Sequence, residues 1–203
     1  AHQLAIMSKA LKRDMEEALC QKNGKTTGDA TTPRKTGAFE SWMTSNVNNQ
    51  AGTTPTGGGT APTDSATLRD LTEALLKDVL QDCFANGGEP SLAICGPHNK
   101  QVISGFTGRS QARQMIDANT VEASVSIYSS DFGELKIVPS NRSRERSLLL
   151  VDPEYAKVSY LRDFKTVDIA TIGDAMTKMI VVEYGLEISN EAAHGLVADL
   201  NIS

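Results

Sequence analysis

A long segment without hydrophobic periodicity limits the folds open to this chain of 203 residues. From Lys25 to about Ser65 the sequence is rich in Gly, Thr, Asn and Pro, with Gly57-Gly58-Gly59 near its end, a composition typical of loops. A loop of that length is rare inside a self-contained domain, so we expect it to be disordered, functional, or supported by something outside the domain. The apolar residues Phe39, Trp42 and Met43 predict that it is fixed at its middle.

Amphipathic helices are expected on both sides of this segment. Before it, apolar residues follow a helical period and predict a helix over residues 1–21 that ends at Asn23-Gly24. The stripe consists of Leu4, Met7, Leu11, Met15 and Leu19. After the segment, Thr67 and Asp70 have the spacing of a capping box, and an apolar face continues through Cys83 until Asn86. We therefore predict a second long helix that begins at Thr67.

The second half of the chain alternates in the way that strands do. We predict a short strand over residues 91–95, and Pro97 is well placed to begin a helix that runs to about Phe106. A hairpin is expected around Asp131-Phe132-Gly133, with strands at residues 121–127 and 134–138. Further strands are predicted at residues 148–151, 158–161 and 176–188. In the last strand one face carries Ile180, Val182, Tyr184, Leu186 and Ile188 and is expected to be buried. These elements indicate an α+β protein with mixed or antiparallel sheets.

Composition narrows the classes of function. A net charge of -5 and a pI near 5.2 argue against tight binding to nucleic acid, which needs clustered Lys and Arg. The three cysteines, Cys20, Cys83 and Cys95, form no C-x-x-C and predict neither zinc nor disulfides. No leader or membrane span is expected, because the apolar runs are far shorter than a bilayer requires. The start at Ala1 suggests that residues upstream have been removed.

Residues that could carry chemistry are sparse, and we predict no catalytic, cofactor-binding or metal-binding residue. His2, His98 and His194 lack a second ligand at metal-binding spacing. The sequence contains no G-x-S-x-G turn, and Gly105 to Ser110 lacks the lysine and spacing of a phosphate loop. Paired acid catalysis is unsupported, because sequence does not give the separation of carboxylates in space. A small hydrolase with an unseen site is a minor alternative.

The densest charge feature is a run of three arginines, Arg142, Arg144 and Arg146, in a chain that is otherwise acidic. The run fits either a solvated loop or a contact with carboxylates of an adjacent subunit, because Arg favours carboxylate pairing at interfaces. Glu183 and Glu187 lie opposite the apolar face of their strand and are solvated or interface groups. The predicted inter-subunit contacts are Arg142, Arg144, Arg146, Phe39, Trp42, Glu183 and Glu187.

Several short strings occur in a recognisable order along nearly the whole chain. They are residues 11–16 (LKRDME), 72–76 (TEALL), 87–90 (GGEP), 96–100 (GPHNK), 104–108 (SGFTG), 130–133 (SDFG), 152–155 (DPEY), 160–162 (YLR), 173–174 (GD), 183–187 (EYGLE) and 190–193 (NEAA). Each string alone is weak, but together they resemble one family of major capsid proteins of tailed bacteriophages, which have the Hong Kong 97 type of fold.

The resemblance implies an architecture. Residues 1–59 would hold the spine helix and long loop of a peripheral domain, residues 60–150 an axial domain near the capsomer centre, and residues 151–203 the strands that return to the periphery. In the family, an N-terminal arm and an extended loop precede the spine helix and clasp neighbouring subunits. Neither is matched in this chain, which puts its assembly alone in doubt.

The resemblance also implies a structural function without catalysis or cofactors. The chain would form hexamers and pentamers that close into an icosahedral shell around packaged double-stranded DNA, which it encloses without sequence-specific binding. Portal, scaffolding and decoration proteins are the implied partners. The implied location is the virion capsid, with the host cytoplasm during assembly and no membrane. A tail or decoration protein is the second alternative, and would form rings or tubes.

Overall fold

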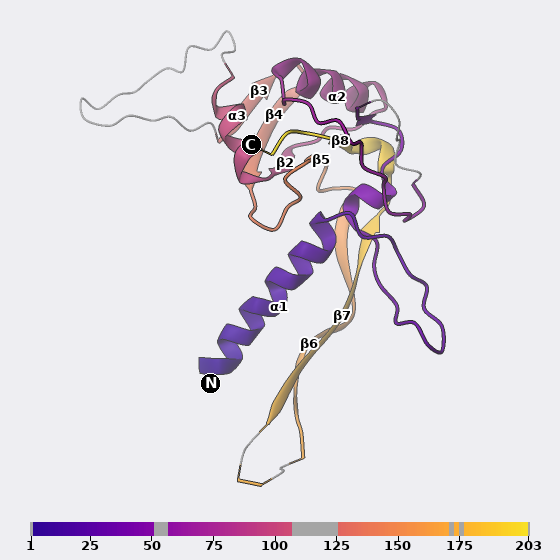
Figure 1. The fold of residues 1–203 in the computed structure, drawn as a ribbon, viewed down its shortest axis with the longest axis vertical. Helices are drawn as coiled ribbons and strands as arrows, with labels where there is room; N and C mark the ends of the chain where they lie inside the picture. Colours follow the sequence, from indigo (N-terminus) through magenta and orange to yellow (C-terminus); the bar gives the residue numbers. More distant parts are fainter. Residues whose placement is uncertain (1, 51–56, 107–125, 171–172, 175–176, 203) are drawn as a thin grey trace, which may run out of the picture.

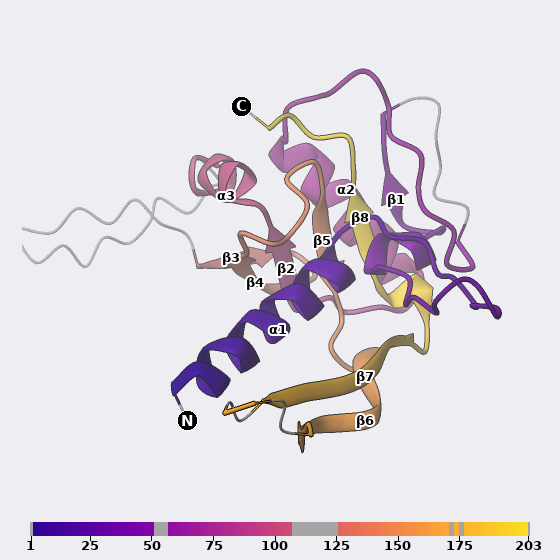
Figure 2. The ribbon, with the colours of Figure 1, turned by 60° about the horizontal axis from the view of Figure 1, so that its bottom comes forward.

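The structure, a computed structural model, describes residues 2–50, 57–106, 126–170, 173–174 and 177–202. It contains helices and strands in two separate sheets (Figure 1), which confirms the predicted mixture of α and β elements. Helix α1 and a two-stranded ribbon extend from the larger sheet toward the same side, as both views show (Figures 1 and 2). No helix within the described ranges has the length and apolar character needed to cross a membrane.

Helix α1 (His2–Cys20) confirms the first predicted helix. Of its apolar stripe only Met15 is buried, and the side chain of Met7 is 62% exposed. The helix is therefore anchored near its C-terminal end, while its N-terminal half carries apolar side chains that the rest of this chain leaves open to solvent.

Helix α2 (Glu73–Ala85) begins later than predicted. Its N-cap is Thr72, whose hydroxyl accepts a hydrogen bond from the Leu75 N–H at 3.4 Å. The predicted capping box at Thr67 is wrong because Arg69 is held in extended pairing with the C-terminal segment. The Arg69 N–H donates to the Asp199 carbonyl at 3.0 Å, and the Asn201 N–H donates to the Arg69 carbonyl at 2.7 Å.

The larger sheet has six strands in the order β1-β8-β5-β2-β4-β3. Their bounds are β1 (Val47–Asn48), β2 (Leu92–Cys95), β3 (Ile127–Ser130), β4 (Gly133–Pro139), β5 (Leu148–Val151) and β8 (Gly195–Val197). Strands β2 and β4 pair in parallel, as do β1 and β8, and the other pairs are antiparallel. The sheet is mixed, and it joins strands from all three segments into which the family resemblance divides the chain.

Strand β2 and the helix that follows it lie close to their predicted positions. Helix α3 (Pro97–Ser104) has proline in its first turn and lies next to β2 in the chain. The β3–β4 hairpin turns at Asp131 and Phe132 as expected, although its first strand is placed at Ile127–Ser130. Most of the predicted strand at residues 121–127 lies outside the described residues.

Strand β5 separates two apolar clusters because all four of its residues are buried. Leu148 and Leu150 face α2 and belong to the larger cluster. Leu149 and Val151 face the opposite side and pack with Phe39, Met43 and Leu196. An uninterrupted apolar strand is expected where a sheet is covered on both faces.

The second cluster confirms that the long loop segment is fixed at its middle. A 3-10 helix, η1 (Phe39–Trp42), lies in the segment and buries Phe39 against Leu149 and Leu196. Strand β1 then adds two residues of the same segment to the edge of the larger sheet through β8. The apolar island therefore ties a segment with little regular structure of its own to the core.

The second sheet is a ribbon of two antiparallel strands, β6 (Ala156–Asp168) and β7 (Lys178–Ile188). The apolar face predicted to be buried in β7 is only half-buried, so that prediction is wrong for the single chain. The reason is architectural: two strands without a covering layer bury little surface, and such a ribbon is marginal on its own in water.

Gly88 provides a stability test of the contact between the α2–β2 loop and the C-terminal segment. A Cβ at this position would lie 2.5 Å from the Cα and 2.6 Å from the carbonyl oxygen of Ala193. Because backbone atoms cannot yield by rotamer change, we expect Gly88→Ala to lower the free energy of unfolding by about 2–3 kcal/mol. Urea denaturation measures this. In the matched variant Gly185→Ala the new Cβ meets no atom within 4 Å, and equal losses in both variants would contradict the proposed clash.

Candidate functional site

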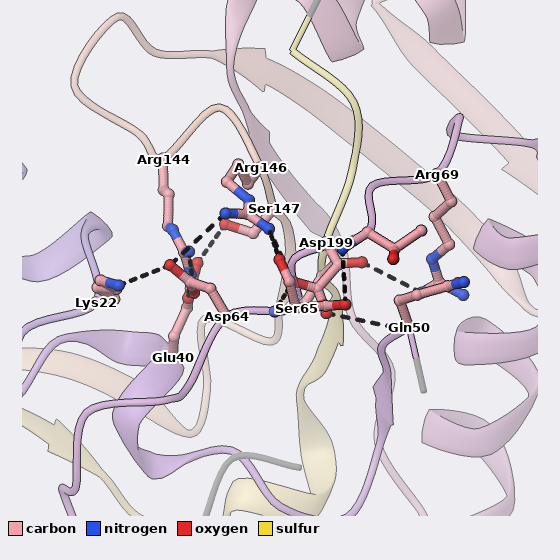
Figure 3. A network of polar contacts seen from close by, with 12 residues as sticks. Lys22, Glu40, Gln50, Asp64, Ser65, Arg69, Arg144, Arg146, Ser147 and Asp199 are labelled. Atoms are coloured by element: carbon pink, nitrogen blue, oxygen red, sulfur yellow. Dashed lines mark hydrogen bonds and ion pairs between the residues drawn. The ribbon is translucent and has the colours of Figure 1, made fainter. Parts of the chain in front are cut away.

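Arg144 joins two carboxylates in a partly buried ion-pair network (Figure 3). Its side chain is 10% exposed, and its Nη1 donates to Glu40 Oε2 at 2.7 Å. Its Nη2 donates to the carboxylate of Asp64. Through Nη1 and Nη2, the guanidinium thus connects η1 to the loop that precedes α2.

The Glu40 carboxylate lies beside this arginine with almost no access to solvent. The Glu40 side chain is 1% exposed, and its second oxygen accepts a hydrogen bond from the Ser147 hydroxyl. Burial raises the pKa of Glu40, while the charge of Arg144 acts in the opposite direction. Asp64 differs: burial raises its pKa, but hydrogen bonds from Lys22 and Arg144 outweigh burial and lower it overall.

Arg146 extends the network to the C-terminal segment. Its Nη2 donates to the Ser65 carbonyl at 2.6 Å and to Asp199 Oδ1 at 3.2 Å. Asp199 has a φ of 59°, in the left-handed region, and its carboxylate accepts from the backbone N–H groups of Ser65 and Gln50. The network therefore connects segments that lie far apart in the sequence.

Arg142 stands apart from the other two arginines. Its Nη1 lies 2.8 Å from Glu17 Oε2 of α1, and the two side chains are 38% and 47% exposed. All three arginines pair with carboxylates, and the partners recorded here belong to the same chain. Contact with an adjacent subunit stays a prediction.

Substitution of Asp64 tests whether its ion pairs hold the loop before α2 in place. We expect Asp64→Asn to loosen residues 57–65, because the variant weakens its interactions with Arg144 and Lys22. Because Asp64 is partly exposed, we expect the local free energy of opening to fall by about 1–2 kcal/mol. This corresponds to roughly 5- to 30-fold faster amide exchange. Hydrogen exchange at the Gly59 and Ser65 amides measures it. Asp78→Asn, at an exposed position on α2, should leave both rates unchanged, and unchanged rates in Asp64→Asn would refute this role.

The apolar residues predicted as contacts lie mostly inside this chain. Phe39 is buried, and its ring meets the ring of His194 edge-on at a centroid distance of 5.0 Å. Trp42 is half-buried beneath Lys25, whose Nζ lies 5.1 Å from the ring centroid. Both residues fix the long segment, and whether they also contact another subunit stays a prediction.

Glu183 and Glu187 lie on the ribbon in partly exposed ion pairs. Glu183 pairs with Arg162 across the strands at 3.3 Å. Glu187 pairs with Lys157 at 3.0 Å and accepts a hydrogen bond from the Ser159 hydroxyl. These cross-strand pairs leave both carboxylates partly accessible, and contact with another subunit stays a prediction.

An open apolar surface lies between α1 and the ribbon, and the sequence did not predict it. A groove of about 600 Å³ is lined by Leu4, Met7 and Leu11 of α1 and by Ile180 of β7, among others. Exposed apolar side chains continue along these elements at Ile6, Met7, Tyr160, Leu161, Val167 and Met179. Contiguous apolar surface marks interaction sites in many proteins. The apolar stripe of α1 was visible in the sequence. The helical period of such a stripe does not show whether it is buried within its own chain or between two chains.

Within the part of the chain that the structure describes, no group of three His, Cys, Asp or Glu side chains is arranged to hold a metal ion. His194 is nevertheless buried, at a position for which the sequence suggested no special role.

The long α1, the two-stranded ribbon and the mixed sheet define a Hong Kong 97 type of capsid fold, and similar solved structures confirm this fold prediction. The family described as SU10 major capsid protein matches residues 1–201. The chain belongs to this family, and membership implies a structural role. The resemblance to phage major capsid proteins is thereby confirmed.

Three similar structures share the fold at low sequence identity. The holo-SrpI encapsulin complex from Synechococcus elongatus PCC 7942 has 14% identity and a TM-score of 0.57 over 99% of this chain. The capsid of an empty GTA particle has 10% identity and a TM-score of 0.56 over 98%. The procapsid of satellite phage P4 with its size determination (Sid) protein has 15% identity and a TM-score of 0.52 over 99%. This chain spans 65% of the length of each. A search of curated proteins finds no significant match.

Proposed function

We propose that copies of this chain assemble into hexamers and pentamers that close into an icosahedral shell around packaged double-stranded DNA. The observation that carries the proposal is membership of the major capsid protein family over residues 1–201. Head-to-tail contacts close into rings when the rotation between subunits permits. Many modest contacts then add up through multivalency to a durable particle.

The open apolar surface supports this proposal physically. The groove between α1 and β7 and the half-buried ribbon are incompletely covered in one chain. A two-stranded ribbon gains stability from further strands or a packed layer, and neighbouring subunits in a shell supply such a layer. The same surface would be costly on a protein that works as a monomer.

The proposed roles of the three segments follow the family. Residues 1–59 and 151–203 supply the peripheral domain, and residues 60–150 supply the axial domain. Helix α1 and the ribbon both extend from the larger sheet and carry exposed apolar side chains, which supports a peripheral role for both. Strand β8 joins the larger sheet, so the C-terminal segment returns from the ribbon to the body of the protein.

Among the predicted contact residues, exposure favours Arg142, Glu183 and Glu187 as direct inter-subunit contacts. Arg144 is already paired with two carboxylates of its own chain, so we propose that it acts on assembly by fixing the loops. Charge reversal separates the two roles. Arg142→Glu should reduce particle yield while the free energy of unfolding changes by less than about 1 kcal/mol. Normal yields of intact particles from Arg142→Glu at ordinary salt would contradict a direct contact.

The proposed function requires no catalysis and no sequence-specific DNA binding. The net charge of -5 supports an inner wall that does not hold DNA tightly, since phosphate contacts need clustered cations. Portal, scaffolding and decoration proteins are the proposed partners, the virion capsid is the proposed location, and assembly takes place in the host cytoplasm. Tight DNA binding by capsomers at physiological salt would contradict the acidic-wall proposal.

Sedimentation velocity over a range of concentrations tests self-assembly. The proposal predicts discrete species of hexamer or pentamer mass that grow into larger closed particles as concentration rises. Monomers throughout the range, from the protein produced from the complete reading frame that encodes this chain, would contradict it. Open tubes or rings would instead favour the alternative of a tail or decoration protein.

A further inference from the structure

The β6–β7 ribbon joins the larger sheet through two short connections that His194 bridges. One connection runs from Asp152 to Tyr155 between β5 and β6, and the other runs from Ser189 to His194 between β7 and β8. The Nδ1 of His194 accepts a hydrogen bond from the Asp152 N–H at 3.1 Å. The Ser189 N–H donates to the Tyr155 carbonyl at 2.9 Å. These two contacts act together with others at the same end of the ribbon. Ala156, Leu186 and Ile188 pack against the apolar cluster around Leu149, and the Leu186 N–H donates to Thr36 Oγ1 at 3.1 Å.

The imidazole of His194 has little freedom to find other partners. The ring is fully buried and lies in edge-to-face contact with the ring of Phe39. The backbone carbonyl of His194 accepts a hydrogen bond from Asn46 Nδ2 at 2.8 Å. The next residue, Gly195, lies so close to α2 that a Cβ there would be 2.5 Å from Val79 Cγ1. The backbone that carries the ring is thus held between α2, the long segment and the first connection.

Protonation conflicts with this arrangement. Because Nδ1 accepts a hydrogen bond, the ring is neutral and carries its proton on Nε2. A second proton on Nδ1 would point at the Asp152 N–H, so two donors would face each other. Within the described residues Nε2 also has no hydrogen-bond partner. Asp152, Glu191 and the Tyr155 backbone favour the charged ring, but burial outweighs them, so the charged form is costly here.

The charged groups near the ring are already engaged elsewhere. The Asp152 carboxylate accepts from the N–H groups of Glu89 and Glu154. The Glu191 carboxylate accepts from the Ser45 hydroxyl and from backbone N–H groups in the same segment.

On the remaining sides the ring meets uncharged groups or charges that are paired with others. Phe39 is apolar, and the neighbouring Glu40 is paired with Arg144. On α2, burial raises the pKa of Cys83 to about 12, so this thiol is neutral. Burial is the largest influence on His194 and lowers its pKa, although Asp152, the Tyr155 backbone and Glu191 act in the opposite direction.

We propose that His194 is a proton-sensitive joint that fixes the ribbon against the larger sheet when neutral and releases it when protonated. This goes beyond shell formation, since it concerns the conformation of each subunit. The ordinary pKa of the side chain is 6.5, and the folded value is lower. The stabilising contribution of His194 is therefore complete above about pH 6.5 and is lost as the pH falls below that value. The ribbon should then change its orientation or sample several.

Two spin labels measure this movement directly. One is placed at Leu161→Cys on the ribbon, whose side chain is 77% exposed, and the other at Asp78→Cys on α2. Cys20, which is half-buried, is replaced by Ser, whereas Cys83 and Cys95 are buried. We expect a narrow distance distribution at about pH 7.5 that shifts or broadens at about pH 5. A distribution that stays the same at both pH values would overturn the proposal.

His194→Asn is the decisive variant, because the Asn Oδ1 can replace Nδ1 as an acceptor but does not titrate in this range. We expect its distance distribution to be independent of pH, whereas the matched variant His98→Asn should respond as the parent protein does. A pH response that persists in His194→Asn would overturn the proposal.

A second measurement on the parent protein serves if His194→Asn fails to fold. Nuclear magnetic resonance follows protonation of the labelled imidazoles, assigned with His2→Asn and His98→Asn. The midpoint of the distance change must coincide with protonation of His194, and separate midpoints would refute the joint.

Discussion

Arg144→Met is expected to lower the free energy of unfolding by about 3–5 kcal/mol, because it leaves a buried carboxylate without its counter-ion. Glu40 is 1% exposed and would retain only the Ser147 hydroxyl as a hydrogen-bond partner recorded for its side chain. Asp64 would lose the same guanidinium. Urea denaturation near neutral pH measures the loss from the transition midpoint and slope.

The pH dependence of the stability of Arg144→Met tests whether the unpaired Glu40 carboxylate causes the loss. Burial already raises the pKa of Glu40 in the folded protein above its ordinary value of 4.5, and removal of Arg144 raises it further. A carboxyl group with a raised folded pKa binds protons more readily when folded, so the variant regains stability as the pH falls toward 4.5. The difference between variant and parent protein should therefore shrink in mild acid.

Arg142→Met is the matched control, because Arg142 forms an ion pair of similar length with Glu17 at a partly exposed site. Its expected cost is at most about 1 kcal/mol. Equal effects of the two substitutions would show that burial does not govern the contribution of these arginines.

Leu149→Ala is expected to lower the free energy of unfolding by about 2–5 kcal/mol. Leu149 is buried on the face of β5 that carries Phe39, Met43 and Leu196. The cavity should loosen the long segment before it loosens α2, which packs on the opposite face of β5. Hydrogen exchange at the Leu196 amide, whose acceptor is the Asn46 carbonyl at 2.9 Å, reports on the affected side.

Two controls locate this effect. Leu150→Ala removes the same atoms from the α2 side of β5 and should loosen α2 preferentially, with a similar total loss. Leu161→Ala, at a position 77% exposed, should change stability by no more than about 0.5 kcal/mol. If Leu149→Ala and Leu150→Ala loosened the same elements equally, β5 would not separate two distinct clusters.

Local patterns account for what could be predicted from sequence. The stripe of α1 and the apolar run of β5 require no knowledge of distant residues, and both elements lie where expected. The proline that begins α3 also has a purely local effect. By contrast, the spacing at Thr67 resembled a helix cap, yet long-range pairing of Arg69 with the C-terminal segment prevents a helix there.

The partners of the candidate site could not be predicted because they come from distant parts of the chain. Arg144 meets Glu40 across 104 positions and Asp64 across 80. Strand β8 has only three residues and exists through its pairing with β5 and β1. His194 is a lone histidine in sequence, and only the fold reveals that it lies between the two connections of the ribbon.

Cryo-electron microscopy of the protein produced from the complete reading frame that encodes this chain tests the central claim most directly. We expect closed particles built of pentamers and hexamers, in which the apolar surface of α1 and the ribbon is covered by adjacent copies. Compact monomers that form no particles, with this surface left open, would contradict that claim.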